Sequence, residues 1–155
     1  LVICSVNPNQ EIEVLHKKTK RSLEKIMHML DHDSGMQGIA GTGNMKTILK
    51  MRKQNKNAQL AIDVFCYHLK LWISRYIGLL NGVDCIVFTA GIGEHASMIR
   101  EQALKEMDYA GIKLDYTKNN RNNEIISTKK SKVTVLVLPT DEEKQMFEEV
   151  KKVLN

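Results

Sequence analysis

The chain has 155 residues, enough for one domain with a hydrophobic core, and its 23 Lys and Arg against 18 Asp and Glu give a formal charge of +5. This charge favours anionic ligands such as nucleotides, but aromatic residues make up only 5% of the chain and no basic stripe interleaves with them, so no nucleic-acid partner is expected. No apolar run is long enough to span a bilayer, and an odd number of cysteines without CxxC spacing indicates reduced thiols, so we expect a soluble, cytoplasmic protein with no membrane partner.

The first third of the chain predicts helices interrupted by a turn. Apolar residues recur at mostly helical spacing from Glu11 to Leu30, which predicts one or two amphipathic helices. Four glycines between Ser34 and Asn44 predict a loop or tight turn, because glycine combines low helix propensity with backbone freedom. The segment MKTILKMRK (45–53) then predicts a short helix.

The strongest helical pattern runs from Asn57 to Leu80, where apolar residues recur every three or four positions. The pair Asn81–Gly82 predicts its end. A helix of this length is expected to cross the whole domain and to carry much of its core. Trp72 and Tyr76 are expected in the core or at a subunit interface.

Strands alternate with helices in the second half, which indicates an α/β fold. The apolar runs CIVFT (85–89) and VTVLVL (133–138) are typical of strands buried on both faces of a parallel sheet. The segments between and after them predict, in order, a helix over Ser97–Met107, a short IKLD strand (112–115), a polar surface loop (116–124), an edge strand EIIST (124–128) and a last helix after Pro139.

The turn after the first of these strands contains Gly91 and Gly93. Glycine lets a backbone approach a ligand without interference from Cβ, and a following helix presents free N–H groups, so this turn is a candidate cradle for phosphate. A tight turn with no ligand remains an alternative.

A dinucleotide-binding domain is a further alternative for the same turn. Gly91, Gly93 and Ala96 match the G-x-G-x-x-G/A pattern after a strand, and Asp115 lies at about the ~20-residue offset of a ribose-binding acid. Glu94 argues against it, because its carboxylate would lie beside a pyrophosphate.

Three blocks of sequence together resemble the C-terminal part of acetate kinase. They are AIDVFCYHLKLWISRYIGLLNGVDCIV (61–87), FTAGIGEHASMIRE (88–101) and VLVLPTDEE (135–143), in the family's order, and the similarity runs from about Ser34 to the end. The resemblance implies a ribonuclease-H-like domain of the acetate and sugar kinase/actin-like ATPase superfamily, with a mixed sheet and flanking helices. It also implies a homodimer that uses ATP or ADP and Mg²⁺ to transfer phosphate between ATP and acetate, giving acetyl phosphate. Residues 1–155 would be the C-terminal nucleotide-binding domain, without the N-terminal acetate-side domain.

The resemblance assigns binding residues by position. The family's G-I-G-E-N nucleotide loop corresponds to Gly91, Ile92, Gly93, Glu94 and His95, with His95 in place of Asn. Its D-x-R nucleotide segment corresponds to Asn44, Met45 and Lys46, where a lysine provides a point charge but not the bidentate fork of arginine. Its T-N-E-E segment corresponds to residues 140–143 and makes Glu142 the counterpart of the glutamate that binds the metal.

The first residues depart from the family. Its R-x-G-D-x-D-P segment matches VICSVNP (2–8), which puts Val2 where the family has a catalytic arginine. An apolar side chain cannot neutralise the charge of a moving phosphoryl group, so no catalytic residue is assigned and this chain alone is expected to make no acetyl phosphate. A non-catalytic remnant or a dimerisation domain is the alternative function.

Overall fold

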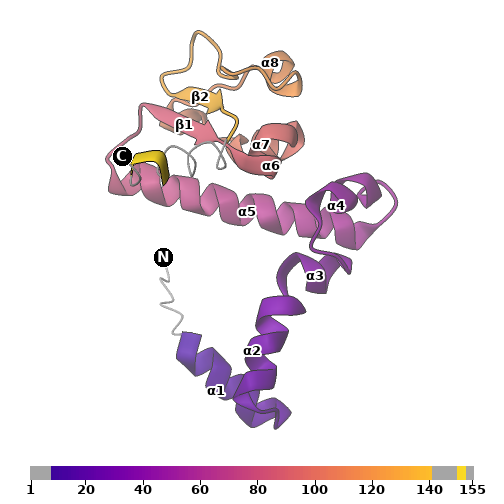
Figure 1. Cartoon of the computed structure of the whole chain (residues 1–155). Helices are drawn as coiled ribbons and strands as arrows, with labels where there is room; N and C mark the ends of the chain where they lie inside the picture. The colour runs from indigo at the N-terminus through magenta and orange to yellow at the C-terminus, as the bar shows by residue number, and fades with distance from the viewer. Residues whose placement is uncertain (1–7, 141–149, 153–155) are drawn as a thin grey trace. The chain divides into compact units, whose positions relative to one another are not determined.

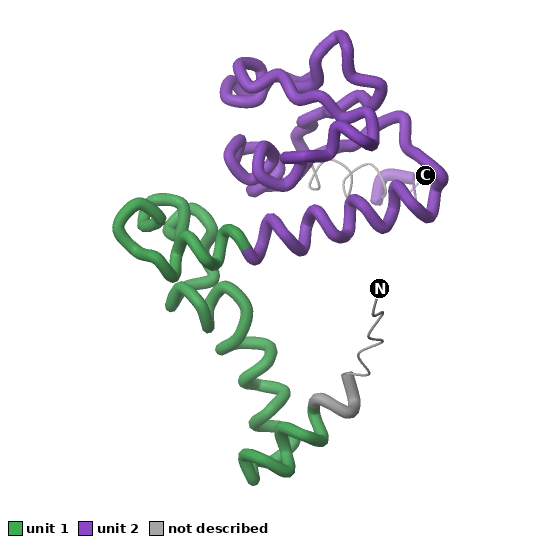
Figure 2. Tube along the Cα trace, turned by 180° about the vertical axis from the view of Figure 1, so that it is seen from behind, with its two compact units in different colours: residues 1–63 green, residues 64–155 purple. Residues whose placement is uncertain are grey.

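The computed structural model describes residues 8–140 and 150–152, which are mainly helical (Figure 1). The chain divides into two compact units, Leu1–Asp63 and Val64–Asn155 (Figure 2). Within the described residues, no helix combines the length and the apolar character needed to cross a membrane.

The first unit begins with two helices, α1 (Pro8–Thr19) and α2 (Leu23–His32), which confirms the prediction from apolar spacing. The Ser22 side chain caps α2 by accepting a hydrogen bond from the backbone N–H of Lys25 at 3.4 Å. Ile26 of α2 is fully buried. The short helix predicted over residues 45–53 is also confirmed, as α4 (Met45–Met51).

The loop predicted from Ser34 to Asn44 is wrong for its first half, which forms the helix α3 (Gly35–Ala40). Gly35 and Gly41 stand at its two ends with φ of 56° and 75°, which glycine adopts without strain. Gly38 lies inside α3, where a Cβ would come within 2.7 Å of the backbone oxygen of Asp33. These glycines therefore allow a short, closely packed helix, and of the predicted loop Ser34 and residues 41–44 remain outside regular structure.

Helix α5 (Lys56–Leu79) confirms the long helix predicted from apolar periodicity. It ends as the Asn81–Gly82 pair predicts: both residues have positive φ, and the Gly82 N–H donates to the Ile77 carbonyl at 2.8 Å. The buried face of the helix carries small and branched residues, namely Ala58, Ala61, Ile62 and Cys66.

The expected core position of Trp72 and Tyr76 is wrong within this chain, because their exposed fractions are 53% and 57%. Their rings stack on each other with centroids 6.3 Å apart, and the Arg75 guanidinium lies 5.0 Å from the Trp72 ring. Their position at a subunit interface stays a prediction.

The second unit contains a parallel pair of strands, β1 (Cys85–Phe88) and β2 (Thr134–Val137), which lie side by side (Figure 1). Cys85 pairs with Thr134 and Phe88 with Val137. Both predicted strands are confirmed, but the prediction that both of their faces are buried is wrong. Val87 is 50% exposed, because the sheet of the described residues has two strands and is covered on one face only.

The chain between the strands forms α6 (Ala90–His95), α7 (Ser97–Leu104), the 3₁₀ helix η1 (Asp108–Ala110) and α8 (Tyr116–Asn120). The helix predicted over Ser97–Met107 therefore ends earlier. The polar surface loop predicted at 116–124 is wrong at its start, where the Asp115 carboxylate caps α8 by accepting from the Lys118 N–H at 3.0 Å. The IKLD and EIIST segments form isolated antiparallel bridges, Leu114 with Ser127 and Ile125 with Leu136. The connectivity is thus mixed α/β.

The core of the second unit lies against one face of the parallel pair. Its buried members come from both strands and from the helices and bridges between them: Phe88, Leu104, Met107, Ile112, Ile126, Val133, Val135 and Val137. This core holds the carboxyl ends of the two strands in a fixed register.

Candidate functional site

The carboxyl ends of β1 and β2 open at the same edge of the sheet, because the strands are parallel and in register. Beyond this edge, the N–H of Leu138 donates to the carbonyl of Phe88 at 2.9 Å and extends the pairing by one residue. In α/β folds, ligands bind outside the carboxyl ends of strands. A ligand site is therefore expected in the segments that follow β1 and β2.

The glycine turn predicted after β1 is a helix of six residues, α6. Thr89 precedes it in an extended conformation, and Ala90 has φ of 59°, so a residue with a Cβ occupies the left-handed region at the first position of the helix. Such a conformation costs about 1 kcal/mol and persists where surrounding contacts fix it. The chain thus reverses sharply between the strand and α6.

The two glycines of α6 have different surroundings. A Cβ on Gly91 would meet no atom of the described residues within 4 Å, so this part of the structure leaves its backbone open to an approaching group. A Cβ on Gly93 would lie 3.2 Å from the carbonyl carbon of Phe88, closer than ordinary contact. Gly93 therefore lets α6 pack directly on β1, a structural reason that the sequence pattern did not separate from ligand binding.

Glu94 joins α6 to the end of the second strand. Its Oε1 accepts two hydrogen bonds from Thr140, one from the backbone N–H at 3.1 Å and one from Oγ1 at 3.2 Å. Thr140 opens the predicted metal-binding segment 140–143. The two segments that sequence places 46 residues apart thus meet through a charged hydrogen-bonded pair. His95, the next residue, is exposed.

Arg100 of α7 is fully buried and contacts the last turn of α6. Its Nη1 donates to the carbonyls of Gly93 at 2.6 Å and Glu94 at 3.0 Å. Its Nε donates to Oδ1 of Asn119 at 2.7 Å, and its Nη2 to the Asn119 carbonyl at 2.8 Å and to Oδ1 of Asn122 at 2.7 Å. All five acceptors are neutral oxygens, and burial lowers the pKa of the guanidinium below its ordinary value.

Neither Arg100 nor Asn119 was predicted as a site residue from the sequence. A signal for Arg100 was present, because it follows Ala96 by four positions and precedes Leu104 by four, on the face of α7 where these residues are buried. No comparable signal marked Asn119, which lies in a run of polar residues yet is fully buried.

Asn44, Met45 and Lys46 lie in the first unit, at the start of α4. The Asn44 side chain caps this helix by accepting from the Thr47 N–H at 3.1 Å and from Thr47 Oγ1 at 3.3 Å. Met45 is buried and packs in the core, whereas Lys46 is exposed. Of the three side chains, Lys46 is thus the one that presents a cation to solvent.

The geometry around Asp115 disfavours the dinucleotide-binding alternative. Asp115 uses its carboxylate to cap α8, and the preceding Leu114 bridges Ser127 in the antiparallel sense. A ribose-binding acid instead follows a strand that is parallel to the first one. Ala96, the third small residue of the pattern, is buried.

Two predicted positions, Val2 and Glu142, lie outside the described residues. Among residues 8–140 and 150–152, no three His, Cys, Asp or Glu side chains gather where a metal ion could be held by protein ligands alone. Mg²⁺ in nucleotide sites takes one or two carboxylates and completes its shell with phosphate oxygens and water, so a sparse carboxylate set is compatible with it.

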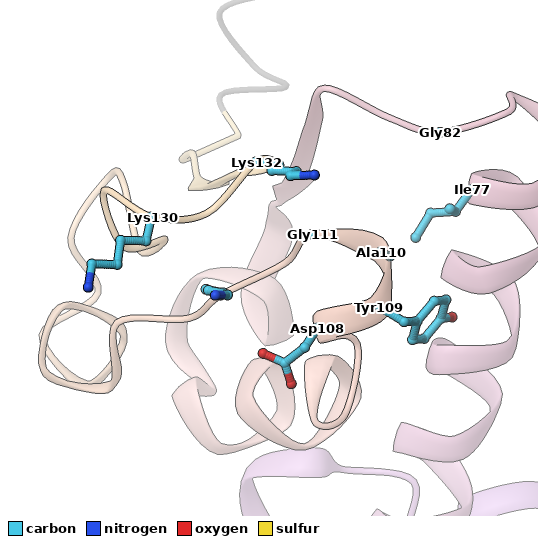
Figure 3. Close-up of a pocket in the computed structure, with 9 residues that line it drawn as sticks. Ile77, Gly82, Asp108, Tyr109, Ala110, Gly111, Lys130 and Lys132 are labelled. Atoms are coloured by element: carbon cyan, nitrogen blue, oxygen red, sulfur yellow. The ribbon is translucent and has the colours of Figure 1, made fainter.

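A cavity of about 490 Å³ lies at the opposite edge of the sheet, among Ile77, Gly82, η1 and the segments carrying Lys113, Lys130 and Lys132. Gly82 and Lys132 precede β1 and β2, so this cavity is at the amino ends of the strands. Figure 3 shows Lys130 on the other side of the cavity from Ile77 and Tyr109. It is therefore separate from the edge that carries α6 and Thr140.

The model of the acetokinase family matches residues 5–148. The chain belongs to this family. The match covers most of the chain and includes both the α6 segment and the segment after β2, so it confirms the resemblance drawn from the three sequence blocks.

Individual relatives agree with the family match. An acetate kinase of Acetivibrio thermocellus is 42% identical over 142 residues, which cover 89% of this chain and 36% of the relative. The chain thus spans little more than a third of the length of the curated acetate kinases it matches.

Solved structures of the family share the fold. The crystal structure of Porphyromonas gingivalis acetate kinase matches with a TM-score of 0.89 at 30% identity, covering 97% of this chain and 39% of that one. A propionate kinase from Francisella tularensis matches with a TM-score of 0.82 at 29% identity, covering 89% of this chain and 36% of that one. The mixed α/β architecture is therefore that of acetate kinase structures.

Proposed function

We propose that this chain is the nucleotide-side part of an acetate kinase, which transfers phosphate between ATP and acetate to give acetyl phosphate. One observation carries the proposal beyond family membership. The hydrogen-bonded pair Glu94–Thr140 joins the predicted nucleotide loop to the predicted metal-binding segment at the carboxyl edge of the sheet.

The residues proposed to bind nucleotide are Gly91–His95 in the second unit and Asn44–Lys46 in the first. Gly91 contributes an exposed backbone without a Cβ, which allows a phosphate to approach the N–H groups at the start of α6. Lys46 contributes an exposed ammonium, a point charge suited to phosphate. Met45 is buried, and we assign its contribution to holding the start of α4 in place.

Glu142 is the proposed metal-binding residue, two positions beyond Thr140. When bound, Mg²⁺ would neutralise charge on the β- and γ-phosphates. The Glu94 carboxylate does not compete for this role through Oε1, because that oxygen is occupied by the two donors of Thr140. Glu94 is instead proposed to keep the two segments together.

The carboxylate acceptor is proposed from the family, in which the solved structures include both an acetate kinase and a propionate kinase. A ribonuclease-H-like domain, a cytoplasmic location and a homodimer are proposed on the same basis. The exposed Trp72 and Tyr76 on α5 support the homodimer, because large aromatic side chains at more than half exposure commonly mark interfaces.

A nucleotide titration tests the proposal. ADP is titrated calorimetrically into the 155-residue chain with and without Mg²⁺, and NADH serves as the competing ligand. The proposal expects saturable ADP binding that Mg²⁺ strengthens. Failure to bind ADP by a folded chain, or tighter binding of NADH than of ADP, would overturn it.

A further inference from the structure

We propose that Arg100 is a positioning residue that fixes the backbone of α6 for nucleotide binding, and that α8 holds Arg100 in place. The inference rests on the proposed nucleotide function of α6. Nothing in the family motif assigns this task to Arg100 or to the buried Asn119, and neither side chain is exposed to a ligand.

The contact with α6 is made through its backbone. The last carbonyls of a helix have no partner within it, and α6 has only six residues, so its own hydrogen bonds hold it weakly. Nη1 of Arg100 satisfies the Gly93 and Glu94 carbonyls together. A cation at the carboxyl end of a helix also complements the helix dipole. Arg100 thus supplies the hydrogen-bond donors that the next turn of a longer helix would provide.

The contact with α8 fixes the other side of the guanidinium. Asn119 accepts two hydrogen bonds from Arg100, and its Nδ2 donates to the Ser97 carbonyl at the start of α7, at 2.9 Å. Asn122 accepts a further bond from Nη2. The guanidinium therefore donates to α8 and to Asn122 just after it on one side, and to α6 on the other. The planar arrangement of its N–H groups allows both sets of bonds at once.

Neutral acceptors suit this task better than a carboxylate would. A carboxylate partner would offset the charge of Arg100 near the backbone proposed to bind phosphate, whereas carbonyl and amide oxygens leave its net positive charge beside α6. The same charge that orders the turn therefore adds to the attraction of α6 for an anion. The predicted result is that substitutions at Asn119 or Asn122, which contribute no ligand contact, weaken nucleotide binding.

The test compares two substitutions with a matched core control. Arg100→Lys keeps a charge but cannot reach both α6 and α8, and Asn122→Gly removes a single acceptor at a residue whose φ of 51° suits glycine. Ile126→Val is the control, because Ile126 is fully buried in the core cluster and makes none of the side-chain hydrogen bonds of Arg100. Each 155-residue variant is measured for ADP affinity and for backbone amide exchange by NMR.

The expected result is a selective one. In Arg100→Lys, exchange at the Ala96 amide, which bonds to the Ile92 carbonyl of α6, accelerates at least tenfold more than at the Thr134 amide, which bonds to Asp84 at the other edge. The dissociation constant for ADP rises at least fivefold. Asn122→Gly has smaller effects in the same direction on the exchange at Ala96 and on the ADP dissociation constant. Ile126→Val accelerates exchange equally at the Ala96 and Thr134 amides and leaves the ADP affinity unchanged.

Two results would overturn the positioning role: equal acceleration of both amides in Arg100→Lys and Asn122→Gly, or unchanged ADP affinity in both. Exchange needs no ligand, so it separates this inference from the proposed function. If the wild-type chain binds no ADP, the proposed function is overturned. The faster exchange at Ala96 than at Thr134 in Arg100→Lys then still decides whether Arg100 positions α6.

Discussion

Glu94 on α6 accepts both the backbone N–H and the Oγ1 of Thr140, the first residue of the segment predicted to bind metal. Hydrogen bonds to a charged group contribute most when removal leaves a buried partner unsatisfied, but Thr140 is exposed and water can replace the lost acceptor. Glu94→Ala should therefore lower the free energy of unfolding by about 1 kcal/mol and weaken ADP binding. Urea denaturation and an ADP titration measure the two effects.

Thr140→Val is the matched variant for this pair. It removes the Oγ1 donor and leaves the backbone N–H that donates to Glu94. We expect about half of the stability loss of Glu94→Ala. Equal loss in both variants would show that the backbone bond contributes nothing.

The two glycines of α6 should respond differently to alanine. Gly91→Ala adds a Cβ that meets no atom within 4 Å in the described part of the chain, so stability should stay the same or rise by up to about 1 kcal/mol from helix propensity, while ADP affinity falls at least tenfold. Gly93→Ala adds a Cβ 3.2 Å from the Phe88 carbonyl carbon and should cost about 1–3 kcal/mol of stability.

Calorimetry and thermal unfolding of both glycine variants give the comparison. Unchanged ADP affinity in Gly91→Ala would contradict close approach of a phosphate at that backbone. Wild-type stability in Gly93→Ala would contradict the close packing of α6 on β1.

The metal assignment predicts a difference between neighbouring glutamates. Glu142→Gln should abolish most of the gain in ADP affinity that Mg²⁺ provides, because the amide retains the shape but not the charge that a hard cation requires. Glu143→Gln should retain that gain. Titrations of ADP at several Mg²⁺ concentrations separate the two, and identical behaviour would reduce Glu142 to a residue that favours a helix start.

The aromatic stripe on α5, formed by Trp72 and Tyr76, predicts an effect on association. Trp72→Ser should lower the free energy of unfolding of the monomer by about 1–2 kcal/mol, because the side chain is only 53% exposed and its ring stacks on Tyr76 and lies beside Arg75. If the stripe is a dimer interface, the same change shifts the mass measured by light scattering toward one copy. A dimer of unchanged affinity would place the interface elsewhere.

Periodicity in the sequence predicted the elements whose apolar pattern is long or continuous. Helix α5 and both strands begin within one residue of the predicted starts. This is because a buried helix face and a buried strand each require apolar residues at regular positions in the sequence. The number of neighbouring strands leaves no such imprint, which is why the exposure of Val87 was not foreseen.

Short helices and the buried polar network were harder to predict. The helix α3 uses glycines at its ends and inside it, so composition alone indicated a loop. Arg100 and Asn119 are 19 positions apart, and each belongs to the interior only because the other satisfies it. A pairing of this kind is set by tertiary structure and has no local pattern to recognise.

The parallel pairing of Cys85 with Thr134 also sets an order of events during synthesis. Strand β1 leaves the ribosome well before β2, and α6, α7 and α8 must emerge between them. Until β2 has emerged, β1 has no partner strand among the described residues, and its apolar side chains remain exposed to other molecules. The nascent chain is therefore expected to be most prone to misassociation just before β2 leaves the ribosome.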